Sequence, residues 1–415
     1  MNKRVVVTGV GMVSPVGIGK EAFWKALISG ECGIEKIGNF DASSYPCKLA
    51  AEIKGFNPAG FILPRETRRC SRGSQFAIVS THLAIEDAGL KIQDENPCDL
   101  GVVYGTALGP MDVIERFCAL FYERGLKRVN PFFIGMINKN AVIGGLAAHF
   151  GIKGYNLSLA AGCGAGNVAI AQAYLAVASG TAELVLAGGV DTPITPSILG
   201  LYTASQALSS LNGNPKKSMC PYDKRRSGFI LGEGAGTLIV ESLDHALKRG
   251  ARIYAEILSS SLTNDAEDAV VFSPNRKEMV VAFKKALKDA DISITDVDYI
   301  CSHAHSSVVL DRKETEAIKE VFGDHAYRLK VSTIKGMIGH SMAGGTAMQS
   351  AAACLALQEG VLPPTINYEV PDPECDLDYV PNQAQRKVID LAIVDSFGLG
   401  GTNVVIVYKK WENFT

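Results

Sequence analysis

The chain has 415 residues, of which 47% are hydrophobic and 20% are charged, and its 41 Lys and Arg nearly balance its 43 Asp and Glu. This composition supplies enough apolar side chains for a large core and excludes a disordered chain. The formal net charge of −2 leaves no global basic field that would hold nucleic acid or an anionic membrane, so we expect neither partner.

The first residues are typical of a buried strand rather than of a targeting segment. Two cations precede an apolar run over Val5–Val13, but Gly9 and Gly11 interrupt it and no small-residue cleavage site follows. No uninterrupted run of about 18 apolar residues occurs, which argues against a membrane-spanning helix. The ten cysteines include no Cys-x-x-Cys pair, so structural zinc and redox dithiols are not expected. We expect a cytoplasmic protein with reduced thiols.

Strand-like and helix-like patterns alternate along the chain. This alternation predicts an α/β fold with buried, largely parallel sheets that helices cover on both faces. The predicted strands are Arg4–Thr8, Leu100–Tyr104, Tyr155–Leu159, Glu183–Leu186, Thr237–Val240, Val297–Cys301, Ala392–Asp395 and Val404–Tyr408. The predicted helices are Lys20–Ser29, Ser74–Ala88, Asn167–Ser179, Lys277–Ala290, Asp311–Phe322 and Thr346–Glu359.

A short internal repeat indicates two similar halves. Gly236-Thr237 and the apolar run after it are similar to Gly401-Thr402 and its own run, at an offset of 165 residues. The offset divides the chain near residues 249–253, where no Pro- or Ser-rich linker occurs. We therefore predict two halves, residues 1–250 and 251–415, fused into one body.

Cys163 stands in a run of very small residues, Ala160–Gly166, between a predicted strand and a predicted helix. Small residues allow a sharp turn and the close approach of a ligand. A thiol at a helix N-terminus has a lowered pKa and is a candidate nucleophile. The alternative is a buried, inert cysteine in a tight turn.

Two of the seven histidines also occupy turns rich in small residues. His303 follows the strand that ends at Cys301, at the edge where ligands bind in open α/β sheets. His340 ends the segment Lys335–His340, before another helix. The remaining histidines other than His305 lie in or beside helical patterns and suit surface or packing positions.

Two other ligand-binding patterns are weak. Alternate strand residues point to opposite faces, so His303 and His305 would share an ion only if the strand ends there, and no carboxylate or third histidine pattern completes the set. The segment Gly9–Ser14 is similar to a dinucleotide fingerprint, but Ser14 replaces the third glycine. We expect neither a metal nor a nicotinamide cofactor.

Taken in order, these motifs resemble those of the elongating β-ketoacyl-[acyl carrier protein] synthases, particularly synthase II. The resemblance extends from Arg4 to about Lys409, nearly the whole chain. The matching segments are Val5–Gly11, Ser14–Gly17, Pro131–Phe133, Cys163 with its small neighbours, Tyr222–Phe229, Gly232–Gly236, Val297–Ile300 with His303, Asp311 with Glu314 and Thr315, Lys335 with Gly339 and His340, and Ser396–Asn403.

The resemblance implies a thiolase-like, five-layered αβαβα fold with two pseudo-repeated halves. It implies a decarboxylative Claisen condensation in fatty acid, polyene or polyketide elongation, in which malonyl-carrier protein extends an acyl chain held as a thioester on Cys163. His303 and His340 would donate hydrogen bonds from neutral imidazoles to the enolate, and Lys335 would position His340. The N–H groups of Cys163 and Leu399 would form the oxyanion hole. The family requires no cofactor.

The resemblance also implies an acyl pocket, a pantetheine tunnel and a partner. The pocket and tunnel residues would be Leu108, Tyr202, Phe272, His305, Ser307 and Leu399. Acyl carrier protein, acyl- and malonyl-loaded, would dock on the basic cluster Arg65, Arg68, Arg69 and Arg72. The family forms homodimers, and some members form heterodimers with a chain-length-factor-like subunit.

Several positions depart from the family pattern. The family usually has Gly-Thr-x-Thr where this chain has Ala304–Ser307, so His305 replaces a hydroxyl expected to hold the pantetheine arm. Gln349 stands nine positions after His340, where the family often has an acidic residue, so Lys335 is expected to lack its usual ion-pair partner. Leu399 replaces an aromatic gate, and Phe272 stands where Thr is common. These departures indicate a specialised synthase.

Two other functions remain open at this point. The first is a chain-length-factor-like, non-catalytic partner subunit, against which Cys163 argues because such subunits usually lack the nucleophile. The second is a thiolase or another non-decarboxylating acyltransferase. Thiolases use a second cysteine as base near the C-terminus, where this chain has His340 and a glycine-rich turn instead.

Overall fold

A single large sheet runs through the protein in the computed structural model, which describes residues 3–268 and 275–412. The strands are β1 (Val5–Ser14), β2 (Gly17–Ile18), β3 (Glu35–Lys36), β4 (Leu49–Ala50), β5 (Leu100–Gly105), β6 (Asn156–Leu159), β7 (Leu184–Asp191), β8 (Gly234–Ser242), β9 (Ala255–Asn264), β10 (Tyr299–Cys301), β11 (Lys330–Ser332), β12 (Val361–Leu362), β13 (Gln385–Arg386), β14 (Leu391–Gly398) and β15 (Thr402–Lys410).

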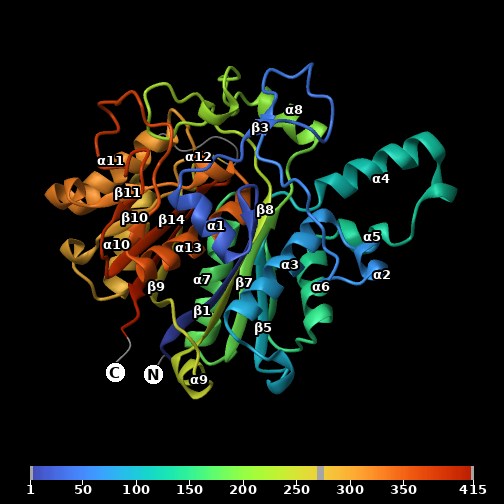
Figure 1. Cartoon of the computed structure of the whole chain (residues 1–415), viewed down its shortest axis with the longest axis horizontal. Coiled ribbons are helices and arrows are strands. Elements are labelled where there is room, and N and C mark those ends of the chain that lie inside the picture. Colours follow the sequence, from blue (N-terminus) through green and yellow to red (C-terminus); the bar gives the residue numbers. More distant parts are fainter. Residues whose placement is uncertain (1–2, 269–274, 413–415) are drawn as a thin grey trace.

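Helices flank the sheet and also run between its two halves (Figure 1). The α-helices are α1 (Lys20–Ile28), α2 (Pro64–Thr67), α3 (Arg72–Asp87), α4 (Met111–Arg124), α5 (Phe133–Ile137), α6 (Ala141–Phe150), α7 (Ala165–Ala178), α8 (Pro196–Ala204), α9 (Leu243–Lys248), α10 (Lys277–Asp289), α11 (Leu310–Phe322), α12 (Lys335–Ile338) and α13 (Met342–Glu359). Short 3₁₀ helices are η1 (Ile92–Asp94), η2 (Leu126–Arg128), η3 (Pro215–Lys217), η4 (Ile294–Asp296) and η5 (Gly323–Tyr327).

The strand order repeats itself across the sheet. The order is β11-β10-β14-β15-β9-β1-β8-β7-β5-β6, so each half places its first strand beside its last strand. The halves join where Val5–Val7 of β1 pairs with Ala255–Ile257 of β9. The strands β8 and β15, which carry the internal sequence repeat, occupy equivalent places in the two halves.

Each half is a mixed sheet, which corrects the expectation of largely parallel sheets. In the C-terminal half, β10 pairs in parallel with β11 and β14, whereas β15 pairs antiparallel with β14 and β9. The N-terminal half repeats this pattern. The antiparallel pairing of β14 with β15 follows from their short connection, because a tight turn at Gly398–Gly401 joins the two strands directly.

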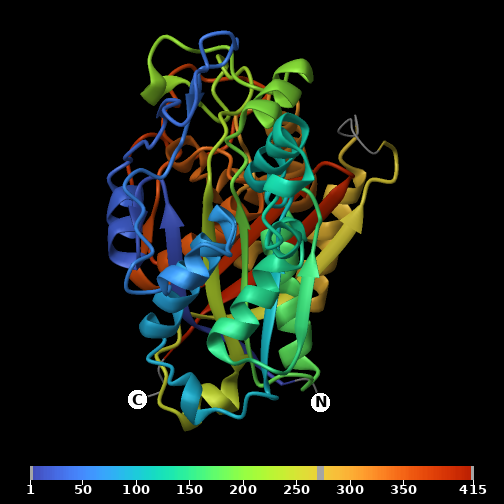
Figure 2. The ribbon, with the colours of Figure 1, turned by 90° about the vertical axis from the view of Figure 1, so that its right-hand side faces the viewer.

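The two half-sheets enclose α7 and α13 and are covered by helices on their outer faces, which makes five layers (Figures 1 and 2). The helix α3 packs on β1 and β8, and α10 packs on β9 and β15. The central pair of helices is rich in Ala and Gly, so their backbones approach closely. A Cβ added to Gly166 of α7 would lie 2.1 Å from the Ala343 carbonyl oxygen of α13. The expected thiolase-like layering is confirmed.

All eight predicted strands and six predicted helices are present, with shifted ends. The helix after Cys163 begins at Ala165 rather than Asn167, and α13 begins four residues before the predicted start. The sequence prediction missed β9, because its buried face includes serines at positions 259 and 261. The hydroxyl of Ser259 donates to the Ala286 carbonyl oxygen at 2.7 Å, which satisfies it inside the core.

An arm formed by α4, η2 and α5 projects from the body (Figure 1). It exposes large apolar side chains, among them Tyr122, Leu126 and Ile134, of which Tyr122 is 83% exposed. Among the described residues, no helix combines the length and the apolar character needed to cross a membrane.

Candidate active site

Cys163 lies in a tight turn between β6 and α7, and only 5% of its surface is exposed. Gly162 before it has φ +55°, and a Cβ there would lie 2.6 Å from the Leu399 carbonyl oxygen, so only glycine fits both the conformation and the space. The turn therefore seats the thiol directly against the β14–β15 connection. The Cys163 sulfur also lies 3.5 Å from the sulfur of Met342.

Burial, together with the nearby carboxylate of Asp191, raises the pKa of the Cys163 thiol to about 12. Lys335 and the backbone N–H groups of Leu399 and Cys163 itself act in the opposite direction. The helix N-terminus predicts a lowered pKa for this thiol, whereas here the effect of removal from water is larger and the pKa is raised. The oxyanion hole expected from the N–H groups of Cys163 and Leu399 stays a prediction.

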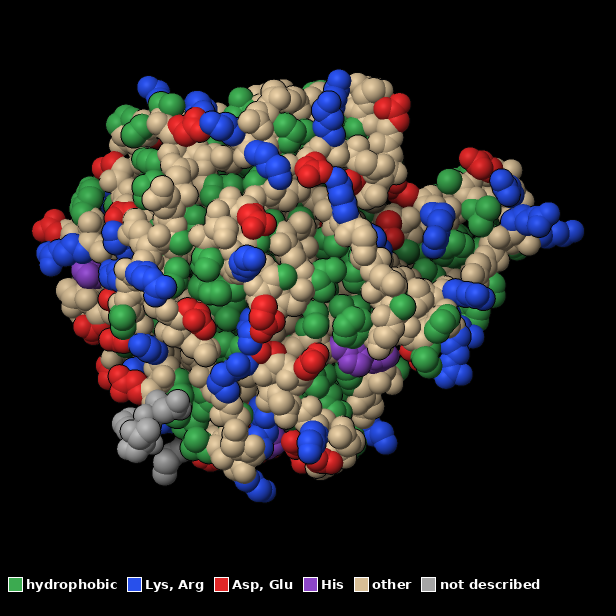
Figure 3. Space-filling view, viewed as in Figure 1, with side chains coloured by type: hydrophobic (Ala, Val, Ile, Leu, Met, Phe, Trp, Pro, Cys, Tyr) green, Lys and Arg blue, Asp and Glu red, His purple; other side chains and the backbone are tan. Residues whose placement is uncertain are grey.

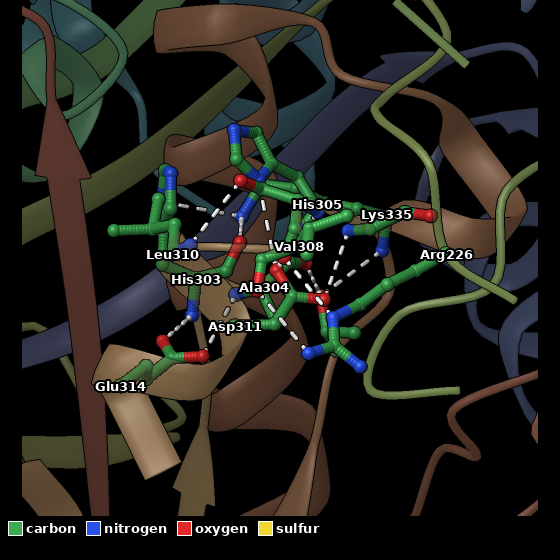
Figure 4. Close-up of polar contacts among 12 residues, drawn as sticks. Arg226, His303, Ala304, His305, Val308, Leu310, Asp311, Glu314 and Lys335 are labelled. Atoms are coloured by element: carbon green, nitrogen blue, oxygen red, sulfur yellow. Dashed lines mark hydrogen bonds and ion pairs between the residues drawn. The ribbon is translucent and has the colours of Figure 1, made fainter. Parts of the chain in front are cut away.

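His303 follows β10 and is fully buried. Its backbone N–H donates to Glu314 Oε1 at 2.7 Å and to Asp395 Oδ1 at 2.8 Å. The carboxylate of Asp311 accepts hydrogen bonds from the backbone N–H groups of residues 305–307, at 3.1–3.2 Å. Figure 4 shows Asp311 and Glu314 among these polar contacts. They fix the loop so that the His303 and His305 rings leave it side by side, with ring centroids 5.2 Å apart.

His340 reaches the same place from a distant stretch of the chain. It follows α12, and its N–H donates to the Ile230 carbonyl oxygen at 2.8 Å while its own carbonyl accepts from Gly232 at 3.0 Å. The ring lies 5.8 Å from the His303 ring and 4.9 Å from the His305 ring, between centroids. The structure therefore brings three imidazoles together, where the sequence predicted two.

The three imidazoles are buried and have depressed pKa values. Burial lowers the pKa of His303 and of His340 far below the ordinary value, and nearby Lys335 lowers both further. Burial also lowers the pKa of His305. Within the described residues, His303 Nε2 and both ring nitrogens of His340 have no hydrogen-bond partner. Both rings are thus neutral and have a nitrogen free for a ligand, as the resemblance implied.

Lys335 is buried and donates to the His303 carbonyl oxygen, with its Nζ 3.4 Å from His303 Nδ1 (Figure 4). The resemblance assigned it to His340, so this expectation is corrected: its described hydrogen bonds serve His303. An ammonium beside Nδ1 favours the tautomer that carries its proton on Nε2. His303 is thereby set up as an Nε2–H donor.

Lys335 does not lack negative neighbours, which corrects the expectation drawn from Gln349. Glu314 and Asp395 both act electrostatically on its ammonium. Gln349 instead donates to the Cys301 carbonyl oxygen and, at 2.9 Å, to that of Asp395. Burial raises the pKa of Asp395 to about 7 and that of Glu314 well above its usual value.

The thiol and the imidazoles share neighbours. Phe397 packs 5.8 Å from the His303 ring, and the next residue, Gly398, is so close to Cys163 that an added Cβ would lie 3.0 Å from the cysteine nitrogen. Phe229 packs against the His340 and His305 rings and belongs to the same apolar cluster as Cys163. The end of β14 and Phe229 therefore enclose the three groups from two sides.

The predicted pocket residues lie in different surroundings. Leu108 and Tyr202 pack against the apolar cluster of Cys163, and the Tyr202 hydroxyl lies 3.9 Å from the Met342 sulfur. The Ser307 hydroxyl accepts the Leu310 N–H at 3.2 Å, so it caps α11. His305 stacks on Phe229 at 5.2 Å. Phe272 lies outside the described residues, and the tunnel itself stays a prediction.

The basic cluster is not uniform. Arg65, Arg68 and Arg69 are exposed on and after α2, and Arg69 lies 4.2 Å over the Phe132 ring of the arm. Arg72 instead turns inward and donates to both carboxylate oxygens of Glu233, at 2.6 and 2.8 Å. Arg72 therefore forms an internal ion pair with Glu233, which leaves Arg65, Arg68 and Arg69 as the arginines of the cluster available to a partner protein.

Sequence reasoning missed the roles of several buried residues. Asp191 accepts N–H groups from Ala107, Leu108 and Ala343, at 2.8–3.0 Å, and so ties three loops together around Cys163. Met342 touches the nucleophile and has φ +48°. Its position after His340 and Ser341, at the start of a small-residue helix, was the available signal. No such signal exists in the sequence for Asp395, because its strand has the pattern of an ordinary apolar run.

Known proteins share this architecture over the whole chain. The model of the β-ketoacyl synthase N-terminal domain matches residues 2–246, and that of the C-terminal domain matches residues 254–369. The chain is 39% identical over 410 residues to the 3-oxoacyl-[acyl-carrier-protein] synthase 2 of Synechocystis sp., with 99% of both chains covered. It is 40% identical over 408 residues to the enzyme of that name from Coxiella burnetii, with 98% of this chain and 99% of that one covered.

Solved structures agree. A type II polyketide ketosynthase in complex with its acyl-carrier protein and bound to the hexaketide has a TM-score of 0.92 and 31% identity, covering 99% of this chain and 100% of that one. A β-ketoacyl synthase from Burkholderia phymatum STM815 also has a TM-score of 0.92, at 28% identity and the same coverage. The chain therefore belongs to the β-ketoacyl synthase family, whose members are condensing acyltransferases of the thiolase fold.

Proposed function

We propose that this chain catalyses a decarboxylative condensation in which Cys163 holds the growing acyl chain and His303 and His340 stabilise the malonyl-derived enolate. The observation that carries the proposal is that a buried thiol and two neutral imidazoles share the neighbour Phe229 or the end of β14, and that each imidazole has an unpartnered ring nitrogen. The substrates are thioesters of acyl carrier protein, as the names of the relatives indicate for those enzymes.

In the first step, the Cys163 sulfur attacks the acyl thioester on the carrier. The new C–S bond forms at the cysteine, the bond to the pantetheine sulfur breaks, and the thiol proton is transferred to that departing sulfur. Because burial keeps Cys163 protonated, the proton must leave as the sulfur attacks, and a neutral imidazole can accept it. Lys335 and the two N–H groups lower the cost of the transient anion.

In the second step, the malonyl carboxylate leaves as carbon dioxide and its bonding electrons form an enolate on the remaining thioester. Donors that face the enolate oxygen stabilise this charge more strongly than the ground state. His303 Nε2–H and a ring N–H of His340 are suited to this role. Both imidazoles are neutral, and the nitrogens in question have no described hydrogen-bond partner, so their N–H groups are available to the enolate oxygen.

In the third step, the enolate carbon attacks the thioester carbonyl carbon on Cys163. A tetrahedral oxyanion forms, and the N–H groups of Cys163 and Leu399 stabilise it. Its collapse releases the β-ketoacyl product on the carrier and returns the electron pair to the cysteine sulfur, which takes up a proton. The sum is one new carbon–carbon bond and one carbon dioxide, with no cofactor needed.

We also propose that the chain acts in the cytoplasm as a homodimer. The apolar side chains on the projecting arm support a second copy, because large exposed apolar patches mark interaction sites. A non-catalytic, chain-length-factor-like role is the less favoured alternative, since Cys163 and both imidazoles are retained. The departures at His305, Gln349 and Leu399 do not remove any group that the three steps require.

The test is to incubate the purified chain with acyl- and malonyl-loaded carrier protein and to detect the β-ketoacyl product by mass spectrometry. We expect acylation of Cys163 in the intact protein, no product from Cys163→Ala, and an unchanged rate from the control Cys98→Ala, which removes an exposed thiol. His303→Ala and His340→Ala should each lower condensation by about 10²–10³-fold while they still permit acylation. Condensation by Cys163→Ala at the wild-type rate would refute the mechanism.

A further inference from the structure

We propose that His303, His305 and His340 form a binding site for a divalent transition metal ion, Zn²⁺ being the best fit, and that the bound ion blocks condensation. All three side chains are buried, and one ligand atom from each lies within 4.8 Å of the others. The site was not expected, because the sequence showed no third histidine near His303 and His305. The binding part of the proposal is independent of the proposed function, whereas the inhibition rests on it.

The ends of the elements explain how alternate residues share one ion. The strand β10 ends at Cys301, so His303 and His305 are in a loop and no longer point to opposite faces of a sheet. Asp311 and Glu314 hold that loop through its N–H groups. His340 closes the set from the turn after α12, with its backbone fixed to the 230–232 segment.

The donor set suits zinc. Neutral imidazoles are preferred ligands of Zn²⁺, and three of them leave one tetrahedral position for water or a thioester oxygen. Zinc–nitrogen bonds of about 2.0–2.1 Å place tetrahedral donors about 3.3 Å apart, so the rings need to close by about 1.5 Å at most from the present spread. His303 Nε2 and both ring nitrogens of His340 have no described hydrogen-bond partner, so these three atoms can turn toward an ion without breaking a hydrogen bond of their own.

Charges around the site both support and limit binding. Asp311 Oδ1 lies 3.8 Å from His305 Nδ1, where a carboxylate typically orients a metal-bound imidazole (Figure 4). Lys335 Nζ, in contrast, is 3.4 Å from His303 Nδ1 and repels a second cation. We therefore expect a weaker site than a structural zinc site, one that responds to the free metal concentration.

Metal binding and catalysis exclude each other in this arrangement. The proposed mechanism needs N–H donors on His303 and His340 that face the enolate oxygen. A ring nitrogen bound to a metal has given its lone pair to the ion and carries no proton. His305 stands where the related family usually has a threonine, so this inhibition would distinguish the chain from relatives that have only two imidazoles.

The test uses the full chain without a polyhistidine tag, first treated with chelator and then dialysed against Zn²⁺ or Co²⁺. We expect one Zn²⁺ per chain and the visible absorption of tetrahedral Co²⁺. His305→Thr should weaken binding at least 10-fold, whereas His149→Ala should not change it. The latter is a control, because His149 pairs with His82 at 2.7 Å and lies outside the cluster of three histidines.

Both assays can contradict the proposal. Equal Zn²⁺ affinity in the wild type and in folded His305→Thr, or no Co²⁺ absorption in the wild type, would overturn the site. His305→Phe, which can keep the stacking on Phe229, provides a second variant should the threonine variant not fold. In condensation assays, Zn²⁺ should inhibit the wild type reversibly and His305→Phe at least 10-fold less. Zinc binding without any condensation activity would refute the proposed function and leave the site intact.

Discussion

Asp395 shows how one buried residue can substitute for the charge that another position lacks. The related family often carries an acid where this chain has Gln349, yet Lys335 still lies in the field of two carboxylates, Glu314 and Asp395. Asp395 also accepts the His303 N–H at 2.8 Å, so it supports the imidazole and the ammonium at once. Gln349 reinforces this strand end by donating to the Asp395 carbonyl oxygen.

Asp395→Asn tests this compensation. The amide can still accept the His303 N–H but supplies no negative charge for Lys335, so we expect condensation to fall by about 10-fold, equivalent to about 1.4 kcal/mol of transition-state stabilisation. Acylation of Cys163 should be affected less, because it does not depend on the enolate donors. Separate measurements of acyl transfer and condensation provide the comparison.

The double variant Asp395→Asn with Gln349→Glu provides the control. It returns one carboxylate to the position that the family often uses, next to the same strand end. If Asp395 compensates for Gln349, the double variant should regain most of the lost rate. A double variant slower than Asp395→Asn alone would show that the two positions are not exchangeable.

At the scale of elements, local patterns were enough to predict most of the fold. Periodicity in runs such as Leu100–Tyr104 depends on neighbours along the chain, so the predicted strands and helices are present with only their ends misplaced, whereas other elements, among them α4, α6 and β11, were not predicted. The strand β9 was missed because its buried face carries serines, and the local sequence does not reveal that α10 accepts the hydrogen bond of Ser259. The topological repeat agrees with the sequence repeat, and we propose that the halves divide near residue 250, between α9 and β9.

The candidate site could be predicted only as far as motifs reach. Cys163, His303 and His340 stood out because each occupies a small-residue turn at the end of an element. The contact of Lys335 with His303, the third imidazole and the raised pKa of Cys163 depend on how distant segments pack. The burial of the Cys163 thiol, in particular, depends on many neighbours from distant parts of the chain, so no pattern near Cys163 in the sequence predicts it.

The close crossing of α7 and α13 leads to a prediction about an element. A Cβ at Gly166 would lie 2.1 Å from the Ala343 carbonyl oxygen, so Gly166→Ala must push the two central helices apart. Overpacking of this kind costs about 1–3 kcal/mol. Because α7 begins directly after Cys163 and α13 directly after His340 and Ser341, we expect lower activity as well as a lower melting temperature.

Gly144→Ala is the matched control for this variant. Gly144 lies in α6, where an added Cβ meets no atom within 4 Å, so the same substitution should stabilise the helix by about 0.5–1 kcal/mol. Thermal denaturation and condensation assays on both variants provide the comparison. Equal melting temperatures for the two variants would show that the helix crossing has more space than the structure indicates.

At the scale of the whole molecule, the near-zero net charge hides a local asymmetry. Lys and Arg side chains gather on the side that carries α2 and the projecting arm (Figures 1 and 3). Arg65, Arg68 and Arg69 are exposed there, and Arg69 lies over Phe132, which connects the cluster to the arm. Arg72 is excluded because Glu233 neutralises it. We propose that an acidic carrier protein docks on this side.

Charge reversal tests whether the carrier docks there. Arg68→Glu should raise the KM for carrier-bound substrate by about 5–10-fold, since exposed charges contribute on the order of 1 kcal/mol to an interface. The rate with a short thioester that lacks the carrier should not change, because the substitution leaves the chamber of Cys163 untouched. Rising salt should weaken wild-type docking and should affect the variant less, because screening acts on the charges that the variant has lost. Arg386→Glu makes the same change at an exposed position on β13 outside the cluster, so an equal rise in KM for that variant would assign the effect to net charge rather than to a docking surface.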